Sequence, residues 1–255
     1  MRRLAGVHEL LDGPLHDEAA LRGNLRDLAR INRWLGGTSA SQRALDRLLA
    51  HRTVSHTMLD VGTGGADIPL ALLERGSRSG RRLRVTGVDS RPEVLDAARA
   101  NDPRLARRPD LELVVSDGGR LPWPDRSFDV VHASLVIHHL EPADALAFLR
   151  EATRVARLGV VVNDLVRARH HWLGARVLLP LMTRNRFTRH DGPLSVRRAY
   201  TRMELRALLA GAALRPVAEV GAFAGHRVAI AAVPMRELEQ QRMPPADAGD
   251  GGGTA

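Results

Sequence analysis

Hydrophobic and polar positions follow two different periods along most of the chain. Short, nearly continuous apolar runs are typical of buried strands, and longer stretches with apolar residues every three to four positions are typical of helices. The runs that predict strands lie at 58–61, 83–89, 111–117, 128–134, 158–164, 215–220 and 227–233. Because strands that alternate with helices form parallel sheets covered on both faces, we expect an α/β fold.

Helical spacing fills most of the intervals between these runs. Ser39 or Ser41 is expected to cap the second helix, and Thr201 with Glu204 forms a capping-box pattern before the last one. Residues 183–200, which are polar, predict a loop, and the Pro- and Gly-rich residues 235–255 predict a disordered tail. The predicted helices lie at 17–35, 41–49, 68–76, 91–100, 142–155, a segment containing 177–182, and 201–209.

Three parts follow from this pattern. Residues 1–54 predict two helices that cover the sheet or form a lid over it, and residues 55–234 predict the sheet domain. Within that domain, residues 165–200 interrupt the regular alternation of strands and helices. An insertion late in such a sheet commonly forms one wall of a binding pocket.

A glycine turn follows the first predicted strand. Asp60 and Val61 lead into Gly62, Gly64 and Gly65, and an apolar helical pattern begins at Ile68. Glycine lets a ligand approach the backbone closely, and the following helix directs its free N–H groups toward that ligand. An ordinary strand-to-helix turn has the same appearance, so other residues must decide between the two.

Carboxylates at successive strand ends favour a ligand site. Asp60, Asp89 and Asp117 all come at the ends of predicted strands, which meet at one edge of a parallel sheet. A dinucleotide would place its pyrophosphate near Asp67, where the two negative charges repel each other. S-adenosylmethionine has no phosphate and carries a positive sulfonium and ammonium, so the charge pattern favours this methyl donor.

Composition narrows the classes of protein. All 38 basic residues are arginine, the net charge is +9, and there is no cysteine. The absence of cysteine excludes disulfides and cysteine-bound zinc, and it suits a reducing cytoplasm. The arginines are spread along the chain, so we expect a solvated basic surface and no nucleic-acid partner. No apolar run approaches the ~20 residues that span a bilayer, so we expect no stable membrane insertion.

The motifs between residues 57 and 164 together resemble class I S-adenosylmethionine-dependent methyltransferases, in particular the ubiquinone/menaquinone-biosynthesis-like group that acts on small molecules. The resemblance implies a Rossmann-like, mostly parallel seven-stranded sheet with an antiparallel last strand, helices on both faces and an N-terminal helical lid. One departure is Ala66, where the family usually has glycine; a methyl group fits there if the residue is already helical. The matching motifs are 59–67, 88–90, 116–118 with Leu121 and Pro122, 128–131 and 137–140.

The resemblance also assigns donor-binding roles. It implies that Gly62 and Gly64 approach the methionine part, that Asp60 supports its ammonium, and that Ser134 lies nearby. Asp89 would hold the ribose hydroxyls, and Asp117 with the Gly118 amide would bind the adenine. The full set of expected donor-binding residues is Asp60, Gly62, Thr63, Gly64, Asp89, Ser90, Asp117, Gly118 and Ser134.

Catalytic and acceptor residues are less sharply indicated. Histidine suits the removal of a proton from the acceptor, which makes His138, His139 and His190 candidates. His139 also has a structural interpretation, because the family often keeps a His-Leu pair there to pack the turn. We expect the acceptor between the N-terminal helices and the 165–200 insertion, near Trp34, Arg189, His190, Arg198 and Tyr200.

The sequence therefore predicts a cytoplasmic enzyme, monomeric or homodimeric, that uses S-adenosylmethionine and no metal. The expected acceptor is a small organic molecule, with an aromatic hydroxyl or an activated ring carbon, from quinone or secondary metabolism. An RNA methyltransferase and a cofactor-binding protein without turnover remain alternatives. Residues 172–182 could also pack on the sheet or touch a membrane to collect a lipid quinone.

Overall fold

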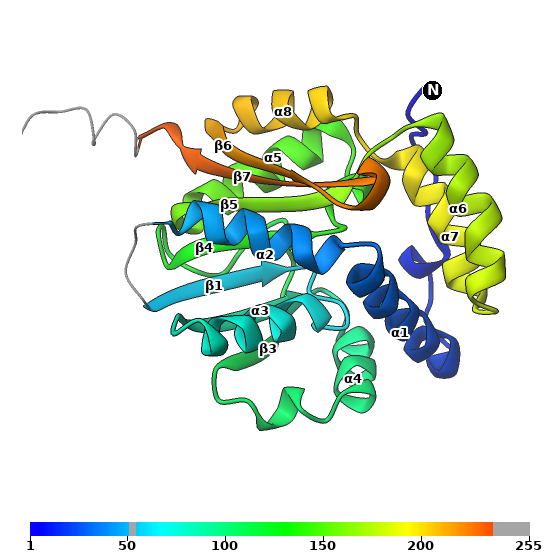
Figure 1. The fold of residues 1–255 in the computed structure, drawn as a ribbon, viewed down its shortest axis with the longest axis horizontal. Helices are drawn as coiled ribbons and strands as arrows, with labels where there is room; N and C mark the ends of the chain where they lie inside the picture. Colours follow the sequence, from blue (N-terminus) through cyan, green and yellow to red (C-terminus); the bar gives the residue numbers. More distant parts are fainter. Residues whose placement is uncertain (51–54, 237–255) are drawn as a thin grey trace, which may run out of the picture.

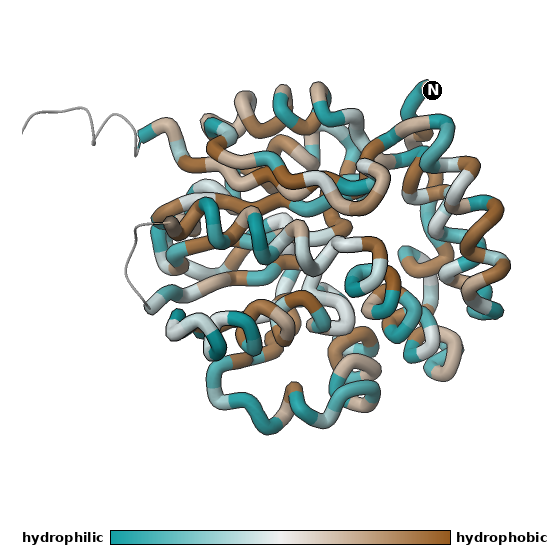
Figure 2. Tube along the Cα trace, viewed as in Figure 1, coloured by the Kyte–Doolittle hydropathy of each residue, from teal (hydrophilic) through white to brown (hydrophobic). Residues whose placement is uncertain are grey.

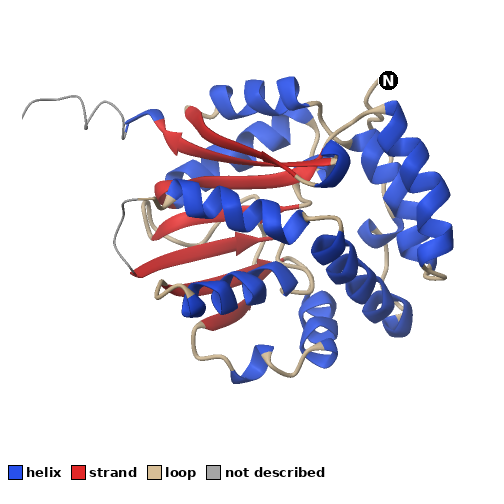
Figure 3. Cartoon of the chain, viewed as in Figure 1, coloured by secondary structure: helices blue, strands red, loops and turns tan. Residues whose placement is uncertain are grey.

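The computed structural model describes residues 1–50 and 55–236, and one seven-stranded sheet organises them (Figures 1 and 3). The strand order is β3-β2-β1-β4-β5-β7-β6, and β7 runs antiparallel to both of its neighbours. This confirms the predicted mostly parallel sheet. The strands are β1 (Ser55–Val61), β2 (Arg82–Asp89), β3 (Leu111–Val115), β4 (Phe128–Ser134), β5 (Ala156–Leu165), β6 (Leu214–Gly221) and β7 (Arg227–Pro234).

Helices cover both faces of this sheet. The helices α2, α3 and α4 pack on one face, whereas α5 and α8 pack on the other. The α-helices are α1 (Glu18–Trp34), α2 (Gly37–Leu48), α3 (Asp67–Arg78), α4 (Pro92–Asn101), α5 (Pro142–Val155), α6 (Arg169–Met182), α7 (Arg186–Arg198) and α8 (Arg202–Gly211). Four short 3-10 helices are η1 (Leu10–Asp12), η2 (Leu105–Arg107), η3 (Ile137–His139) and η4 (Phe223–Gly225).

Strand alternation divides the core into two layers. Leu59 and Val61 of β1 face α5 and α8, whereas Met58, which precedes Leu59, lies with α2 in the opposite layer. Side chains of a strand point to alternate faces, so a sheet covered on both sides needs apolar residues at every position. Aliphatic residues supply both layers, as the brown segments inside Figure 2 show.

The helices α1, α4, α6 and α7 gather at the carboxyl ends of the parallel strands, together with the N-terminus (Figure 1). The predicted loop at 183–200 was wrong, because α7 occupies most of it. Asn185 caps this helix by accepting from the backbone N–H groups of Phe187 and Thr188. Gly192 and Pro193 disfavour a helix locally, but burial of Phe187 and Val196 outweighs this preference.

Of the other local predictions, one is confirmed and one is wrong. The capping box of Thr201 and Glu204 is confirmed. The expected serine cap of α2 is wrong: Gly36, at φ +83°, precedes that helix, and Ser41 is buried inside it. The predicted disordered tail, 235–255, lies almost wholly outside the described residues. Among the helices that the structure describes, none is long and apolar enough to cross a membrane.

Candidate active site

The glycine turn between β1 and α3 is held in an unusual backbone conformation. Gly62 and Gly64 have φ values of +68° and +53°, and Ala66 has φ +53°. A Cβ on Gly62 would lie 2.5 Å from Val136 Cγ2, whereas one on Gly64 would have no neighbour within 4 Å. The backbone at Gly64 therefore faces open space. Ala66 is not yet helical, because it is a left-handed residue that precedes the helix, and its methyl group is accommodated there nevertheless.

Asp89 is fixed beside this open space. Its two carboxylate oxygens accept from the backbone N–H groups of Gly64 and Arg91, each at 3.1 Å. Partial burial raises the pKa of this carboxyl group, although both hydrogen bonds oppose the shift. Each oxygen keeps a further lone pair for a ligand. Asp89 is thus oriented by the turn that it stands next to.

The other two predicted carboxylates differ from each other. Asp117 is exposed at the end of β3 and accepts from the Gly119 N–H at 2.9 Å. Asp60 is 3% exposed, and its Oδ1 lies 2.5 Å from Nδ1 of His132 on β4. Asp89 and Asp117 therefore lie at the expected edge of the sheet, whereas the Asp60 side chain points into the protein beneath the turn.

A continuous buried chain of polar side chains runs below the glycine turn. Asn163 donates to Ser41 Oγ at 2.7 Å, and the same hydroxyl lies 2.8 Å from His132 Nε2. The other ring nitrogen, Nδ1, faces the Asp60 carboxylate. Sequence reasoning missed most of this chain. In order of contact its members are Asp60, His132, Ser41, Asn163, Arg227, Asn32 and Asp67.

Arg227 is the only arginine in this polar chain, and its side chain is 1% exposed. Its guanidinium donates to Asn32 Oδ1 at 2.6 Å, to Ser134 Oγ at 2.7 Å and to Asn163 Oδ1 at 3.1 Å. Burial lowers the pKa of Arg227 to about 10. Ser134, one of the expected donor-binding residues, is therefore tied to the protein interior through its hydroxyl.

Thr63 and Ser90 take different positions around the turn. The Thr63 side chain is buried, and its Oγ1 would be 2.8 Å from a Cβ on Gly87 of β2. It packs the turn against β2, and its backbone N–H donates to the Val88 carbonyl oxygen at 2.8 Å. Ser90 is exposed after β2, next to Asp89, and Gly118 is partly exposed next to Asp117.

His138 and His139 lie side by side on η3, just beyond β4. His138 is buried, and its Nδ1 lies 2.7 Å from Asp164 Oδ1. His139 is partly exposed, and its Nδ1 lies 3.1 Å from Asp12 Oδ1. Each histidine is thus oriented by a carboxylate, which leaves its Nε2 as the second functional atom.

The N-terminal segment brings Glu9 to these histidines. Each Nε2 lies 3.8 Å from one Glu9 oxygen, and burial raises the pKa of Glu9 to about 7. Such a spacing of two imidazoles and a carboxylate also suits a metal ion, but the guanidinium of Arg198 already supplies a positive charge 3.6 Å from Glu9. No sequence pattern had indicated Glu9 or Asp12, because their partners lie more than 120 residues away.

The acceptor residues expected on the insertion fall into two groups. His190 is exposed on α7 and lies 2.8 Å from its predicted partner Asp191, and Arg189 is exposed as well. Arg198 and Tyr200 are instead buried, and they support η3 by donating to the carbonyl oxygens of His139 and Leu140. The expectation that these two side chains line an open acceptor wall is therefore corrected.

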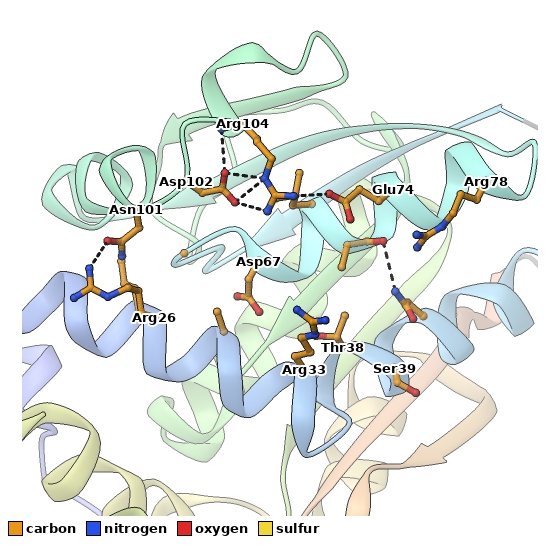
Figure 4. Close-up of a pocket in the computed structure, with 16 residues that line it drawn as sticks. Arg26, Arg33, Thr38, Ser39, Asp67, Glu74, Arg78, Asn101, Asp102 and Arg104 are labelled. Carbon is orange, nitrogen blue, oxygen red and sulfur yellow. Dashed lines mark hydrogen bonds and ion pairs between the residues drawn. The ribbon is translucent and has the colours of Figure 1, made fainter. Parts of the chain in front are cut away.

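Two hollows border the N-terminal helices, and neither is the space over Gly64. One, of about 100 Å³, is lined by Trp34, Leu179 and Met182, which is small for an aromatic acceptor. The other, of about 580 Å³, lies between α1, α2 and α3 and meets the glycine turn only near Gly65 (Figure 4). Its walls mix arginines with acids, such as Arg104 with Asp102 and Glu74.

A family model described as a methyltransferase domain matches residues 59–162. These residues contain the glycine turn, Asp89, Asp117 and both histidines of η3. Residues 59–162 therefore resemble a methyltransferase domain. The match does not include Glu9, Asp12, Arg227 or any part of α6 and α7.

Curated relatives share this domain in part. A malonyl-[acyl-carrier protein] O-methyltransferase of Halorhodospira halophila is 36% identical over 115 residues, which are 45% of this chain and 36% of the relative. A ubiquinone/menaquinone biosynthesis C-methyltransferase of Rickettsia bellii is 30% identical over 104 residues, 41% of each chain. A phosphatidylethanolamine N-methyltransferase of Cereibacter sphaeroides is 31% identical, covering 46% of this chain and 57% of the relative. The chain thus spans roughly a third to three fifths of these relatives.

Solved structures extend the likeness of the fold beyond the methyltransferase domain. A methyltransferase of Aquifex aeolicus aligns with 83% of this chain and 97% of its own, at a TM-score of 0.59 and 20% identity. A mitomycin 7-O-methyltransferase aligns with 90% of this chain and 62% of its own, at a TM-score of 0.63 and 20% identity. At these identities the likeness concerns the fold alone.

Proposed function

We propose that this chain transfers the methyl group of S-adenosylmethionine to a small organic acceptor, either an aromatic hydroxyl of the phenol or quinol type or an activated ring carbon. The open space over Gly64, beside the oriented carboxylate of Asp89, is the observation that carries the donor assignment. The ubiquinone/menaquinone and demethylmenaquinone methyltransferases among the partial relatives support the acceptor class.

The residues around the turn fit this donor in chemistry. Asp89 has lone pairs left to accept from two ribose hydroxyls, and Asp117 with the Gly118 amide is available to the adenine. The donor is positively charged at its sulfonium and ammonium, so a carboxylate-rich edge attracts it. The expected role of Asp60 in supporting the ammonium would be exerted from its buried position beneath the turn. Three further residues complete the proposed donor site by their position: Thr63 in the glycine turn, Ser90 after Asp89, and Ser134 at the end of β4.

Positioning supplies much of the proposed catalysis. Bound S-adenosylmethionine provides an electrophilic methyl carbon, and the protein holds the acceptor atom in line with it. Val136 packs against Gly62 and so fixes the position of the glycine turn relative to η3. The segment from β4 to η3 therefore aligns the donor site with the histidines that follow it.

His139 is the proposed proton acceptor for a phenolic substrate. Its side chain is partly exposed, and the hydrogen bond of its Nδ1 to Asp12 fixes which ring nitrogen is available. His138 is buried between Asp164 and Glu9, so it positions η3. Exposed His190 and Arg189 on α7 remain proposed acceptor contacts, as does exposed Trp34 on α1.

Two glycine substitutions test the donor site. We expect Gly64→Ala to lower the stability by only about 1–2 kcal/mol, because a left-handed residue with a Cβ is strained but has room. We also expect it to weaken S-adenosylmethionine binding at least ~10-fold, since the methyl group enters the space that faces the donor. Calorimetry with the donor and urea unfolding measure the two effects.

Gly62→Ala is the matched comparison. It should lower the stability by about 2–5 kcal/mol, because overpacking against Val136 adds to the same backbone strain. Wild-type donor affinity in a folded Gly64→Ala protein would place the donor elsewhere.

Methyl transfer itself is tested with isotope-labelled donor and a panel of acceptors. The panel contains phenols, quinols, activated aromatic carbons and transfer RNA, so that the small-molecule and RNA alternatives are compared directly. We expect label in at least one phenol or quinol and none in RNA. Label only in RNA, or donor binding without transfer to any member, would contradict the proposed acceptor class.

A further inference from the structure

Exposed apolar side chains form a stripe along α6, a helix at the outer end of the molecule (Figure 1). At about 100° per residue, its members fall on one side of the helix. Leu181 is the most exposed, at 79%. Exposed apolar side chains that gather on one face mark interaction sites, whereas single ones are ordinary. The stripe consists of Leu173, Val177, Leu178, Leu181 and Met182.

Positive charge borders this stripe. Arg169 and Arg176 are exposed along one edge of it, within about 60° of Leu173 around the helix. The following turn and α7 add exposed Arg184, Arg186 and Arg189. Residues 166–200 contain a single acidic residue, Asp191, and its carboxylate is buried in hydrogen bonds to η1.

An exposed aromatic side chain adjoins the stripe at Met182. Trp34 of α1 is 67% exposed and lines a small hollow together with Met182 and Leu179. Trp172 lies on α6 itself, about 100° around the helix from Leu173 and beyond the arginine edge, with the guanidinium of Arg176 5.8 Å from its ring centre. Tryptophan prefers the boundary between water and lipid, because it combines a large apolar ring with an N–H donor.

We propose that α6 docks the protein on an anionic lipid bilayer, with the apolar stripe in the headgroup region and the arginines against lipid phosphates. Apolar and basic groups on one exposed face match the composition of such a surface. A second copy of the chain would bring the same arginines together, so charge favours the bilayer over self-association. With only 14 residues, α6 lies in the interface without crossing it.

This docking deepens the proposed function, because it would bring a lipid-soluble acceptor to the protein. It does not depend on methyl transfer, and its test uses binding alone. Failure of the vesicle experiment would therefore leave methylation of water-soluble acceptors unaffected. Conversely, vesicle binding by a protein that transfers no methyl group would support docking and contradict the proposed function.

Flotation of the full chain with lipid vesicles tests the proposal. One vesicle type is pure phosphatidylcholine, and the other contains roughly a third phosphatidylglycerol. We expect binding mainly to the anionic vesicles and a marked decrease at high salt, because salt screens exposed charges. The double variant Leu173→Glu/Leu181→Glu should bind at least ~10-fold more weakly, and Arg169→Gln/Arg176→Gln should lose much of the salt dependence.

Met203→Glu is the matched control, because Met203 is 77% exposed but lies on α8, away from α6. It should bind vesicles like the wild type. Absence of binding to anionic vesicles, or equal loss in Met203→Glu and the α6 double variant, would overturn the proposal. A wild-type dimer in light scattering that the α6 double variant separates would assign the stripe to a second copy instead.

Discussion

Replacing Arg227 by methionine is expected to lower the free energy of unfolding by about 3–5 kcal/mol. The substitution keeps most of the apolar volume but removes the donors that satisfy Asn32, Ser134 and Asn163. Each buried acceptor left without a partner costs about 1–3 kcal/mol, and Asp67 and Asp164 lose a nearby positive charge. Urea unfolding followed by circular dichroism measures the change.

Arg206→Met is the control for this prediction. Arg206 bonds to Glu219 on the surface, where such pairs contribute about 0–1 kcal/mol. A loss of less than ~1 kcal/mol in Arg227→Met would mean that water or rearranged side chains can replace the guanidinium. The buried polar chain would then not hold β7 to α1 as its contacts indicate.

Asp89→Ala is expected to weaken S-adenosylmethionine binding by about 2–4 kcal/mol, or roughly 30- to 700-fold, through loss of charge-assisted hydrogen bonds to the ribose. The protein without donor should also become less stable by about 1–2 kcal/mol, because the carboxylate holds the N–H groups of Gly64 and Arg91.

Asp89→Asn separates the two effects. Its amide oxygen retains one acceptor for the turn while the charge is removed, so the stability should recover more than the donor affinity. Asp96→Ala, an exposed substitution on α4, should leave both unchanged. Calorimetry with the donor, its demethylated product and NAD provides the measurement. Unaltered donor affinity in Asp89→Ala, or tighter binding of NAD in the wild type, would place the ribose elsewhere.

Much of the fold could be predicted because its signals are local. Seven strands, the glycine turn and the capping box of Thr201 each follow from residues close together in sequence. Errors arose where distant contacts outweighed local preference. The helix α7 forms despite Gly192 and Pro193, since Phe187 and Val196 become buried, and Ala66 accepts a left-handed conformation at the start of α3.

The candidate site divides in the same way. By itself the sequence determined the turn and the carboxylates Asp89 and Asp117, because strand ends in a parallel sheet share one edge. Only the tertiary structure decided that Glu9 and Asp12 meet the histidines of η3, and that Asp60 and Arg227 belong to a buried chain. The sequence pattern around a charged residue at a strand end is the same whether its side chain is solvated or buried. Only partners far along the chain determine which of the two occurs.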